Sequence, residues 1–337
     1  MTLSVVNKQE NNPDVLHNIL IPFQKQISEL EGTLLSLLDS EVPFVRSVAE
    51  YILKNGGKRL RPVLTVISAK MSGFSGIQAY KMGGCIEFIH TASLLHDDVV
   101  DNAKIRRGQT SVNAKWGNHV SVLVGDFFYS RASQLLTEQA NLKILKVVTD
   151  CITALTEGEV LEIVTNSNHK TTREEYLTII KNKTALLFSA ACEVGGLLGG
   201  VSNNFQEALK EYGYHLGMAF QLADDVLDYT SSEEVFGKAM GVDLQEGKLT
   251  LPLITALGFA SEAEALVIKN ALLGKRLEHE LFLEVKNIIK KYNGFELTFE
   301  LARDHINKAK QSLTPFRDSI EKDILLTIAD YVVTRNF

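Results

Sequence analysis

The sequence has few cysteines, few prolines and no extended apolar run, and each scarcity excludes a class of protein. Three of the 337 residues are cysteines, an odd number without CxxC spacing. They are Cys85, Cys151 and Cys192. This set does not suggest a disulfide framework and is typical of reduced core thiols, so a cytoplasmic protein is expected.

The six prolines are scattered, and no Ser/Pro-rich stretch indicates a linker. We therefore expect one domain over residues 13–337, preceded by a polar, flexible N-terminus over residues 1–12. The N-terminus lacks a basic region followed by an apolar run, so no secretion signal is expected. The longest apolar stretch, Thr184 to Gly200, is interrupted by Glu193 and four glycines, which argues against a membrane span.

Basic residues are not in excess either, since the net charge is −6. The sequence therefore predicts no face for binding nucleic acid. Hydrophobic residues make up 45% and charged residues 23% of the chain, as is usual for a soluble globular protein.

Helical periodicity is abundant, whereas alternation typical of strands is nearly absent. Val15, Ile19, Phe23 and Ile27 recur at i, i+4 spacing, as a stripe facing the core should. We expect a helix capped by Ser40 and ending at Lys54, and further helices at about 60–72, 77–100, 118–138, 141–166, 172–200, 202–230, 249–259, 261–272, 279–292, 295–312 and 319–334. The predicted fold class is all-α with long central helices.

Four glycines lie inside these helical patterns, each at a cost of about 1 kcal/mol relative to alanine. They are Gly83, Gly84, Gly213 and Gly217. We expect close approach between helices to compensate for this cost.

An apolar helix that ends in three carboxylates is the first candidate site. At about 100° per residue, Asp101 lies about 40° and Asp98 about 100° from Asp97, so all three acids share one arc. A helix C-terminus carries partial negative charge and favours cations. Three anions there require an external cation, and a hard divalent ion such as Mg²⁺, shared with substrate phosphates, fits best.

The same acids at the same spacing end a second apolar helix, as Asp224, Asp225 and Asp228. One such triplet is usually a solvated face. Two of them, brought face to face, would form an anionic mouth that needs metal ions and an anionic ligand.

With these two motifs, the chain resembles trans-polyprenyl diphosphate synthases, most closely the octaprenyl type. Further matches include Gly56-Gly57-Lys58-Arg59-Leu60-Arg61-Pro62 and Gly125-Asp126-Phe127-Phe128-Tyr129-Ser130-Arg131-Ala132. The resemblance implies an isoprenoid synthase-type helical bundle around a central apolar cavity. It also implies about three Mg²⁺ ions with substrate bound, held by the six aspartates, and a homodimer with the helix from Asn118 to about Glu138 near the interface.

The basic residues of the first matching segment suggest a phosphate site. Lys58 and Arg61 are three apart and share a face once the helix has begun. Arginine offers a planar fork for phosphate oxygens and lysine a point charge beside it. The resemblance implies that both bind isopentenyl diphosphate, together with His90 and Arg107, and that Arg106 contacts the allylic diphosphate.

Lys183 and Thr184 are expected to begin an apolar helix, where a lysine opposes the helix dipole and suggests a nearby anion. The resemblance implies that Lys183 binds the allylic diphosphate, that the Thr184 carbonyl faces the developing cation, and that Gln221 stabilises this cation without reacting with it. Lys238 and Lys248 match lysines of the family in the loop after the second acidic motif. Lys183 and Gln221 are therefore predicted to act with the aspartates in catalysis.

The sequence contains no Ser/His/Asp set and no obvious general base, but it has cation sites, anion clamps and an apolar interior. We predict Mg²⁺-dependent 1′-4 condensation of isopentenyl diphosphate onto an allylic diphosphate, with farnesyl diphosphate as the expected primer, giving about C40 for quinone side chains. Three alternatives remain open: a terpene cyclase, a synthase making C15 or C20 products, and a non-catalytic regulatory subunit. The first typically lacks the second motif and the Lys58–Arg61 segment, and the last should have lost acids or arginines.

Product length is expected to depend on small side chains one turn before Asp97. Members of the family with short products carry aromatic residues at the positions of Ala92 or Ser93, and Ser133 stands where many long-chain enzymes have phenylalanine. That serine leaves C45 or C50 open beside C40. Small residues also allow close helix packing, so this interpretation has a structural alternative.

Ala92→Phe or Ser93→Phe should shorten the product sharply without abolishing the first condensations, because an aromatic ring would block the apolar chain early. Sizing the products of both variants and of the wild type by chromatography measures this. Unchanged length in both variants, or a wild-type product no longer than C20, would contradict it.

Overall fold

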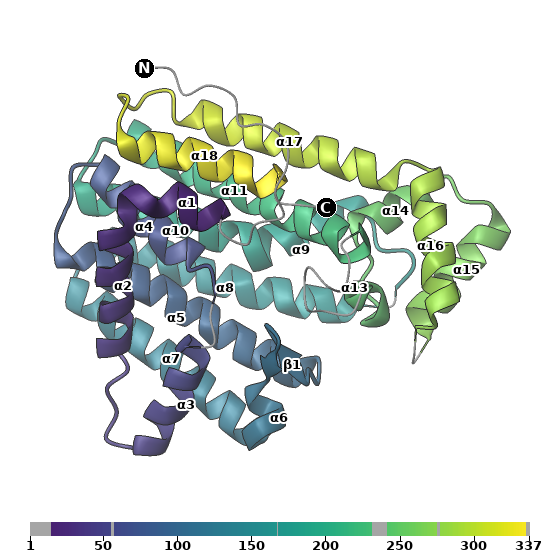
Figure 1. Ribbon diagram of the computed structural model, residues 1–337, viewed down its shortest axis with the longest axis horizontal. Coiled ribbons are helices and arrows are strands. Elements are labelled where there is room, and N and C mark those ends of the chain that lie inside the picture. The colour runs from purple at the N-terminus through teal and green to yellow at the C-terminus, as the bar shows by residue number, and fades with distance from the viewer. Residues whose placement is uncertain (1–14, 55–56, 167, 231–240, 275–276, 335–337) are drawn as a thin grey trace.

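The computed structural model describes residues 15–54, 57–166, 168–230, 241–274 and 277–334, and the N-terminal segment 1–12 and Lys238 lie outside them. Helices account for most of the described chain (Figure 1). The elements are α1 Val15–Leu20, η1 Ile21–Phe23, α2 Gln24–Ser36, α3 Pro43–Lys54, α4 Leu60–Met71, α5 Ile77–Val100, β1 Ile105–Arg106, β2 Gln109–Thr110, α6 Val112–Trp116, α7 Asn118–Gln139, α8 Leu142–Thr165, α9 Arg173–Ile180, η2 Lys181–Ala185, α10 Leu186–Gly199, α11 Asn203–Thr230, α13 Val242–Gln245, α14 Leu251–Leu257, α15 Glu262–Leu273, α16 His279–Lys291, α17 Gly294–Ser312 and α18 Ile320–Thr334. The predicted all-α class is confirmed.

The long helices lie roughly side by side, with α17 and α18 along one edge, α10 and α11 next to them, and α5, α7 and α8 beyond (Figure 1). α5 and α10 are apolar on nearly all sides, and a helix of that kind is stable only when neighbours surround it. This arrangement buries α5, which ends at the first acidic motif, and α10, which begins just after Lys183.

Two clusters of buried apolar side chains support the bundle. The larger spans α1 to α11 and extends to α17 and α18, and the smaller lies among α13 to α17. α11 belongs to both, because Leu222 packs in the first and Val226 in the second. The single domain predicted for residues 13–337 stays a prediction, which this shared helix supports.

Three local features differ from the expected helices. α3 begins at Pro43 rather than after Ser40, whose hydroxyl accepts a hydrogen bond from the Val42 N–H at 3.2 Å. The helix expected over 172–200 contains the π-helical turn η2, so it is not uniformly α-helical. A short antiparallel hairpin, β1–β2, follows the first acidic motif.

Close helix approach at the interior glycines is confirmed. A Cβ at Gly213 would lie 2.4 Å from the Phe188 carbonyl oxygen, and one at Gly217 would lie 2.6 Å from the Cα of Ala185. α10 and α11 can therefore touch backbone to backbone, which holds η2 against the second acidic motif. A Cβ at Gly83 would lie 3.0 Å from the Pro62 carbonyl oxygen of α4, and one at Gly84 would lie 2.9 Å from the side chain of Leu37, just after α2.

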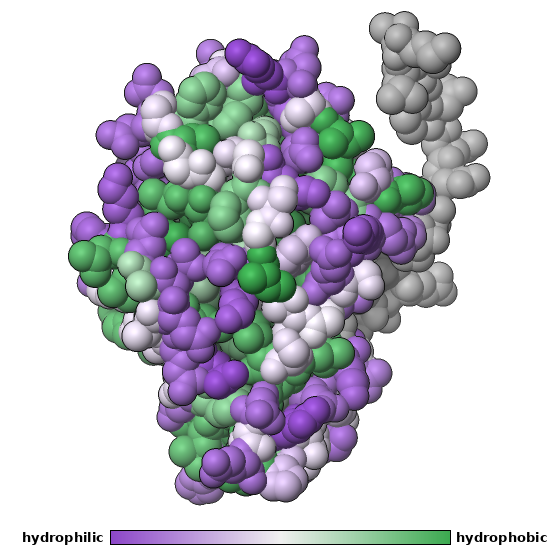
Figure 2. Space-filling view, turned by 90° about the vertical axis from the view of Figure 1, so that its left-hand side faces the viewer, coloured by the Kyte–Doolittle hydropathy of each residue, from purple (hydrophilic) through white to green (hydrophobic). Residues whose placement is uncertain are grey.

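The surface near α2 shows apolar patches between polar side chains (Figure 2). Among the described helices, none combines the length and apolar character needed to cross a bilayer.

Gly213→Ala should lower the free energy of unfolding by about 1–3 kcal/mol, because the added methyl must push α10 and α11 apart. Gly32→Ala is the matched control: it is also inside a helix, but nothing lies within 4 Å of its added Cβ. That variant should be stabilised by about 0.5–1 kcal/mol. Urea denaturation of both measures the difference, and equal effects would contradict the close contact.

Candidate active site

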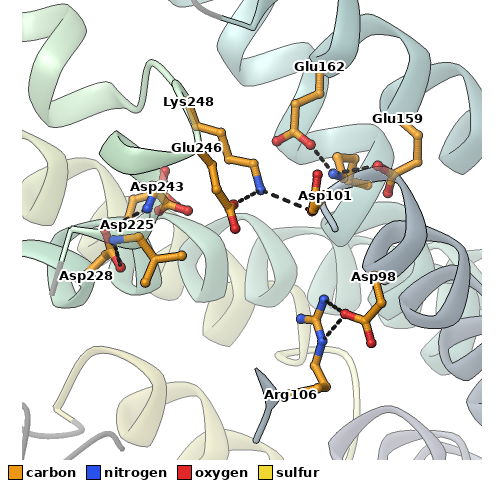
Figure 3. Close-up of polar contacts among 12 residues, drawn as sticks. Asp98, Asp101, Arg106, Glu159, Glu162, Asp225, Asp228, Asp243, Glu246 and Lys248 are labelled. Atoms are coloured by element: carbon orange, nitrogen blue, oxygen red, sulfur yellow. Dashed lines mark hydrogen bonds and ion pairs between the residues drawn. The ribbon is translucent and has the colours of Figure 1, made fainter. Parts of the chain in front are cut away.

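The structure places the two acidic motifs on either side of one mouth (Figure 3). Asp98 and Asp101 come from the end of α5, and Asp225 and Asp228 from α11. Lys248 lies between them, with its Nζ 2.8 Å from Glu246 Oε2 and 3.9 Å from Asp101 Oδ2. The segment after the second motif thus reaches across to the first.

A cavity of about 150 Å³ opens next to the second motif. Its polar lining includes Glu162, Lys183, Thr184, Gln221, Asp225, Asp243 and Lys248. Predicted catalytic and substrate-binding residues from distant parts of the chain therefore meet in one place.

The three acids of the first motif have different surroundings. Asp98 is buried and forms an ion pair with Arg106, whose Nε donates to Asp98 Oδ1 at 2.7 Å. Burial raises the pKa of Asp97 to about 6, since nearby Lys183 compensates only in part. Burial also raises the pKa of Asp101. Asp98 thus contacts the β1–β2 hairpin through Arg106. For Asp97 and Asp101, partial burial disfavours the ionised form, and a bound cation would stabilise that form.

The three acids of the second motif also have different surroundings. The buried carboxylate of Asp225 accepts hydrogen bonds from Tyr176 Oη at 2.5 Å and Gln221 Nε2 at 2.8 Å. Burial, with Asp243 nearby, raises its pKa well above the usual range. The other end of the Gln221 amide accepts from Thr184 Oγ1 at 2.8 Å. This chain of hydrogen bonds orients Gln221 between the acid and η2.

Asp228 is bound to the segment that follows. Its two carboxylate oxygens accept the N–H groups of Val242 and Asp243 at 3.2 and 3.1 Å. The first acid of the motif, Asp224, lies near Arg61: burial lowers the pKa of that guanidinium to about 10, and Asp224 is among the carboxylates that partly oppose this shift.

Lys183 lies inside η2, not at the start of a helix as expected. Its Nζ is 2.6 Å from Glu159 Oε2 and also pairs with Glu162. Burial lowers the pKa of Lys183, but Glu162 and Glu159 outweigh burial and the net shift is upward. The sequence suggested an anion near Lys183, and in the structure two carboxylates of α8 occupy that place.

These two glutamates were not among the predicted site residues. They lie three apart on α8, so they share a face, and Gly158 lets η2 approach: a Cβ there would be 2.7 Å from the Cβ of Asn182. Burial raises the pKa of Glu159 to about 7. Their spacing alone gave no clear signal, because α8 carries other charged residues, among them Asp150 and Glu157.

A separate basic cluster, formed by Lys58, Arg61, His90 and Arg107, lies near Asp224 of the second motif. The Nη1 of the half-buried Arg61 lies 3.2 Å from His90 Nε2, and its guanidinium lies 4.4 Å from the centre of the Phe188 ring. Its Nε is buried without a hydrogen-bond partner among the described residues. Burial, then Arg61 and Arg107, lowers the pKa of His90 well below its usual value, so a neutral imidazole accepts from Arg61. The roles predicted for Arg61 and His90 stay predictions. The face expected to be shared by Lys58 and Arg61 required a helix that includes both, but α4 begins at Leu60, after Lys58.

Lys58 and Arg107 belong to the same basic cluster and come from two other parts of the chain. Lys58 Nζ donates to Tyr331 Oη at 2.6 Å, so the C-terminal α18 contributes a residue that no local pattern could indicate. Arg107 occupies the turn of the β1–β2 hairpin with a φ of 52°. Its guanidinium packs on Gly57, where a Cβ would lie 2.3 Å from Nη1. Only glycine allows this contact.

The residues predicted to set product length are not all inside the bundle. Ala92 is fully buried and Ser93 is 7% exposed. Ser133 lies on an exposed face of α7, and its hydroxyl donates to the Tyr129 carbonyl at 2.9 Å. Ser133 therefore does not lie in the buried interior of this chain.

In the described ranges, no three carboxylate, imidazole or thiol side chains lie close enough together to hold a metal ion by themselves. Mg²⁺ commonly takes only one or two carboxylates and fills its other positions with water and substrate phosphates. The acids on the two sides of the mouth fit that habit better than a closed protein site.

Comparison with known proteins agrees with this geometry. The family described as polyprenyl synthetase matches residues 42–289. An octaprenyl diphosphate synthase of Haemophilus influenzae is 38% identical over 326 residues, covering 96% of this chain and 97% of that protein. A geranylgeranyl diphosphate synthase of Methanosarcina mazei is 35% identical over 310 residues, covering 89% and 94%.

A solved structure is also closely similar. It is a polyprenyl synthase from Caulobacter crescentus, complexed with calcium and isoprenyl diphosphate. It superimposes with a TM-score of 0.90 at 36% identity, covering 97% of this chain and 99% of that one. The fold and the matches define a prenyltransferase with the all-α isoprenoid synthase fold. The chain belongs to the polyprenyl synthetase family.

Proposed function

We propose that this chain is a long-chain all-trans polyprenyl diphosphate synthase that adds isopentenyl diphosphate repeatedly, by 1′-4 condensation, to an allylic diphosphate such as farnesyl diphosphate. The observation that carries this proposal is the acidic mouth together with a separate basic cluster around the contact of Arg61 with His90. Two diphosphates of different roles require two such sites. A product of about C40, used for quinone side chains, is the favoured outcome.

The acids of the mouth would hold Mg²⁺ with the allylic diphosphate. The proposed ligands are Asp97, Asp98 and Asp101 on one side and Asp224, Asp225 and Asp228 on the other. Asp98, Asp225 and Asp228 also contact Arg106, Tyr176 and the N-terminus of α13, and these contacts orient them. When bound, Mg²⁺ stabilises the charge of the departing diphosphate.

The basic side chains divide between the two substrates. Arg106, Lys183 and Lys248 are proposed to bind the allylic diphosphate, and Lys238 is placed with them on resemblance alone. The second group is proposed to bind isopentenyl diphosphate and consists of Lys58, Arg61, His90 and Arg107. Arg106 and Lys183 are already paired with carboxylates, so a diphosphate would compete with those carboxylates for them.

The proposed reaction depends on how the two substrates are positioned, and no side chain is needed to remove the proton. The Thr184 carbonyl and the Gln221 amide are proposed to face the allylic cation, and their mutual hydrogen bond holds both in place. Attack by the double bond of isopentenyl diphosphate forms the new C–C bond. The released diphosphate takes the proton from C2 of that unit. Fixing both substrates supplies much of the rate.

The proposal also includes the length of the product. The buried, small Ala92 and Ser93 support a long apolar chain beside α5, whereas the exposed Ser133 adds nothing within one chain. The relatives include both an octaprenyl and a geranylgeranyl diphosphate synthase. One assay decides between C15–C20 and longer products, and also tests for a non-catalytic subunit: purified chain is incubated with farnesyl diphosphate, isopentenyl diphosphate and Mg²⁺, and the product is sized.

A homodimer is also proposed, with α7 near its interface. α7 exposes Val122 and Leu123, the latter at 66%, and the adjoining α8 exposes Val160, Ile163 and Val164. An apolar surface of this kind is commonly an interaction site.

Light scattering at micromolar concentration should give the mass of two chains. Leu123→Glu should reduce it toward one chain, because a carboxylate would be buried in the interface. Leu266→Glu, on the exposed surface of α15, is the matched control and should leave the mass unchanged. A monomeric mass for the active wild type would contradict the proposal.

Asp97→Ala and Asp224→Ala should each lower turnover by about a hundredfold or more, because each removes a proposed ligand of the ions that stabilise the leaving diphosphate. Helicity should not change. Asp150→Ala, which removes an exposed acid paired with Lys146 on α8, is the control and should keep full activity. Turnover is measured with varied Mg²⁺ and with excess chelator. Full activity in chelator would rule out the metal-dependent mechanism.

A further inference from the structure

Arg59 stands between the two basic residues assigned to isopentenyl diphosphate, yet it points away from both. Its Nη1 lies 2.5 Å from Glu87 Oε1, and its Nη2 donates to the Leu53 carbonyl oxygen. The side chains of Arg59 and Glu87 are 11% and 4% exposed. Arg59 is therefore committed to the protein interior and is not available to a diphosphate.

The contacts of Arg59 join three helices at the edge of the basic cluster. Leu53 belongs to α3 and Glu87 to α5, while Arg59 is the residue that precedes α4. Arg59 has a φ of 47°, a left-handed conformation that residues other than glycine seldom adopt. Such a conformation persists only where surrounding contacts hold it, and here the two-point contact of the guanidinium does so.

This anchored backbone directs the two basic neighbours of Arg59 to different helices. Lys58 reaches Tyr331 on α18, and Arg61 reaches His90 on α5. His90 lies three residues after Glu87, so the residue that fixes Arg59 and the residue that meets Arg61 share a face of one helix.

Glu87 is also the carboxylate with the largest effect on the arginines of the basic cluster. Burial lowers the pKa of Arg61 to about 10 and lowers that of Arg107, and in each case the Glu87 carboxylate opposes this shift more than any other charged group. A buried anion therefore accompanies the cations where a second anion, a diphosphate, is proposed to bind.

We propose that Arg59 and Glu87 are positioning residues for the isopentenyl diphosphate pocket: their ion pair holds the segment from Lys58 to Arg61 in the conformation that presents both basic groups to the diphosphate. This inference rests on the function proposed above. The competing explanation is charge balance, in which Glu87 only offsets the positive charge of the pocket.

Arg59→Lys separates these explanations because it keeps the charge but loses the planar fork that contacts Glu87 and Leu53 together. The KM for isopentenyl diphosphate should rise about tenfold, as for the loss of one charged hydrogen bond, while kcat and the KM for the allylic substrate stay unchanged. Arg46→Lys is the matched control, since that exposed arginine also pairs with a glutamate, Glu50. It should change none of the three constants.

The double variant Arg59→Gln with Glu87→Gln guards against failure to fold, because it leaves no buried charge alone. It also keeps the net charge of the pocket. Positioning predicts that the KM for isopentenyl diphosphate stays raised, whereas charge balance predicts the wild-type value. Thermal melting followed by circular dichroism shows which variants are folded under assay conditions.

A wild-type KM for isopentenyl diphosphate in folded Arg59→Lys or in the folded double variant would overturn the proposal. So would an equal rise in the KM of the allylic substrate. If neither variant folds, the pair is a requirement of the fold and its assignment to one substrate is rejected. A wild-type chain that performs no condensation would instead refute the proposed function, so the two failures are distinguishable.

Discussion

Lys183 and Lys248 carry their charges into a cavity lined by carboxylates, and this burial of opposite charges governs the site. Burial raises the pKa of Asp97 to about 6 and that of Glu159 to about 7. Removing one partner from such a set leaves an uncompensated buried charge, which is far more costly than the intact set. The two lysines therefore stabilise the neighbouring carboxylates. A ligand that carries both cations and anions could replace the ion pairs between them without changing the net charge of the site.

The helical frame makes this arrangement possible because it leaves little freedom around the mouth. α10 and α11 touch at Gly213 and Gly217, which fixes the π-helical turn containing Lys183 and Thr184 beside Gln221. Turns of this kind inside α-helices frequently occur at functional sites. The same packing that forms the core therefore also sets the distances in the site.

Local patterns predicted much of this molecule. Periodicity placed α5 and α11 nearly to their observed ends, because their apolar residues must face neighbours along the whole length. Spacing alone put Asp97 and Asp101 on one arc and His90 on a shared face with them. The π-helical turn, the β1–β2 hairpin and the later start of α3 were missed. The last two have local causes: Pro43 is a favoured first helical residue, and Arg107 and Gly108 adopt the positive φ of a tight turn.

The residues that sequence reasoning missed in the site share one property: their partners are far away in the chain. Glu159 and Glu162 meet Lys183 from another helix, Tyr331 meets Lys58, and Arg59 turns inward to Glu87. The sequence by itself determined the helices, the two acidic motifs and the residue types able to bind metal and diphosphate, because these follow from periodicity and short spacing. Only the tertiary structure decided which acids and cations pair and which are buried, because pairing and desolvation depend on distances between helices that no local pattern contains.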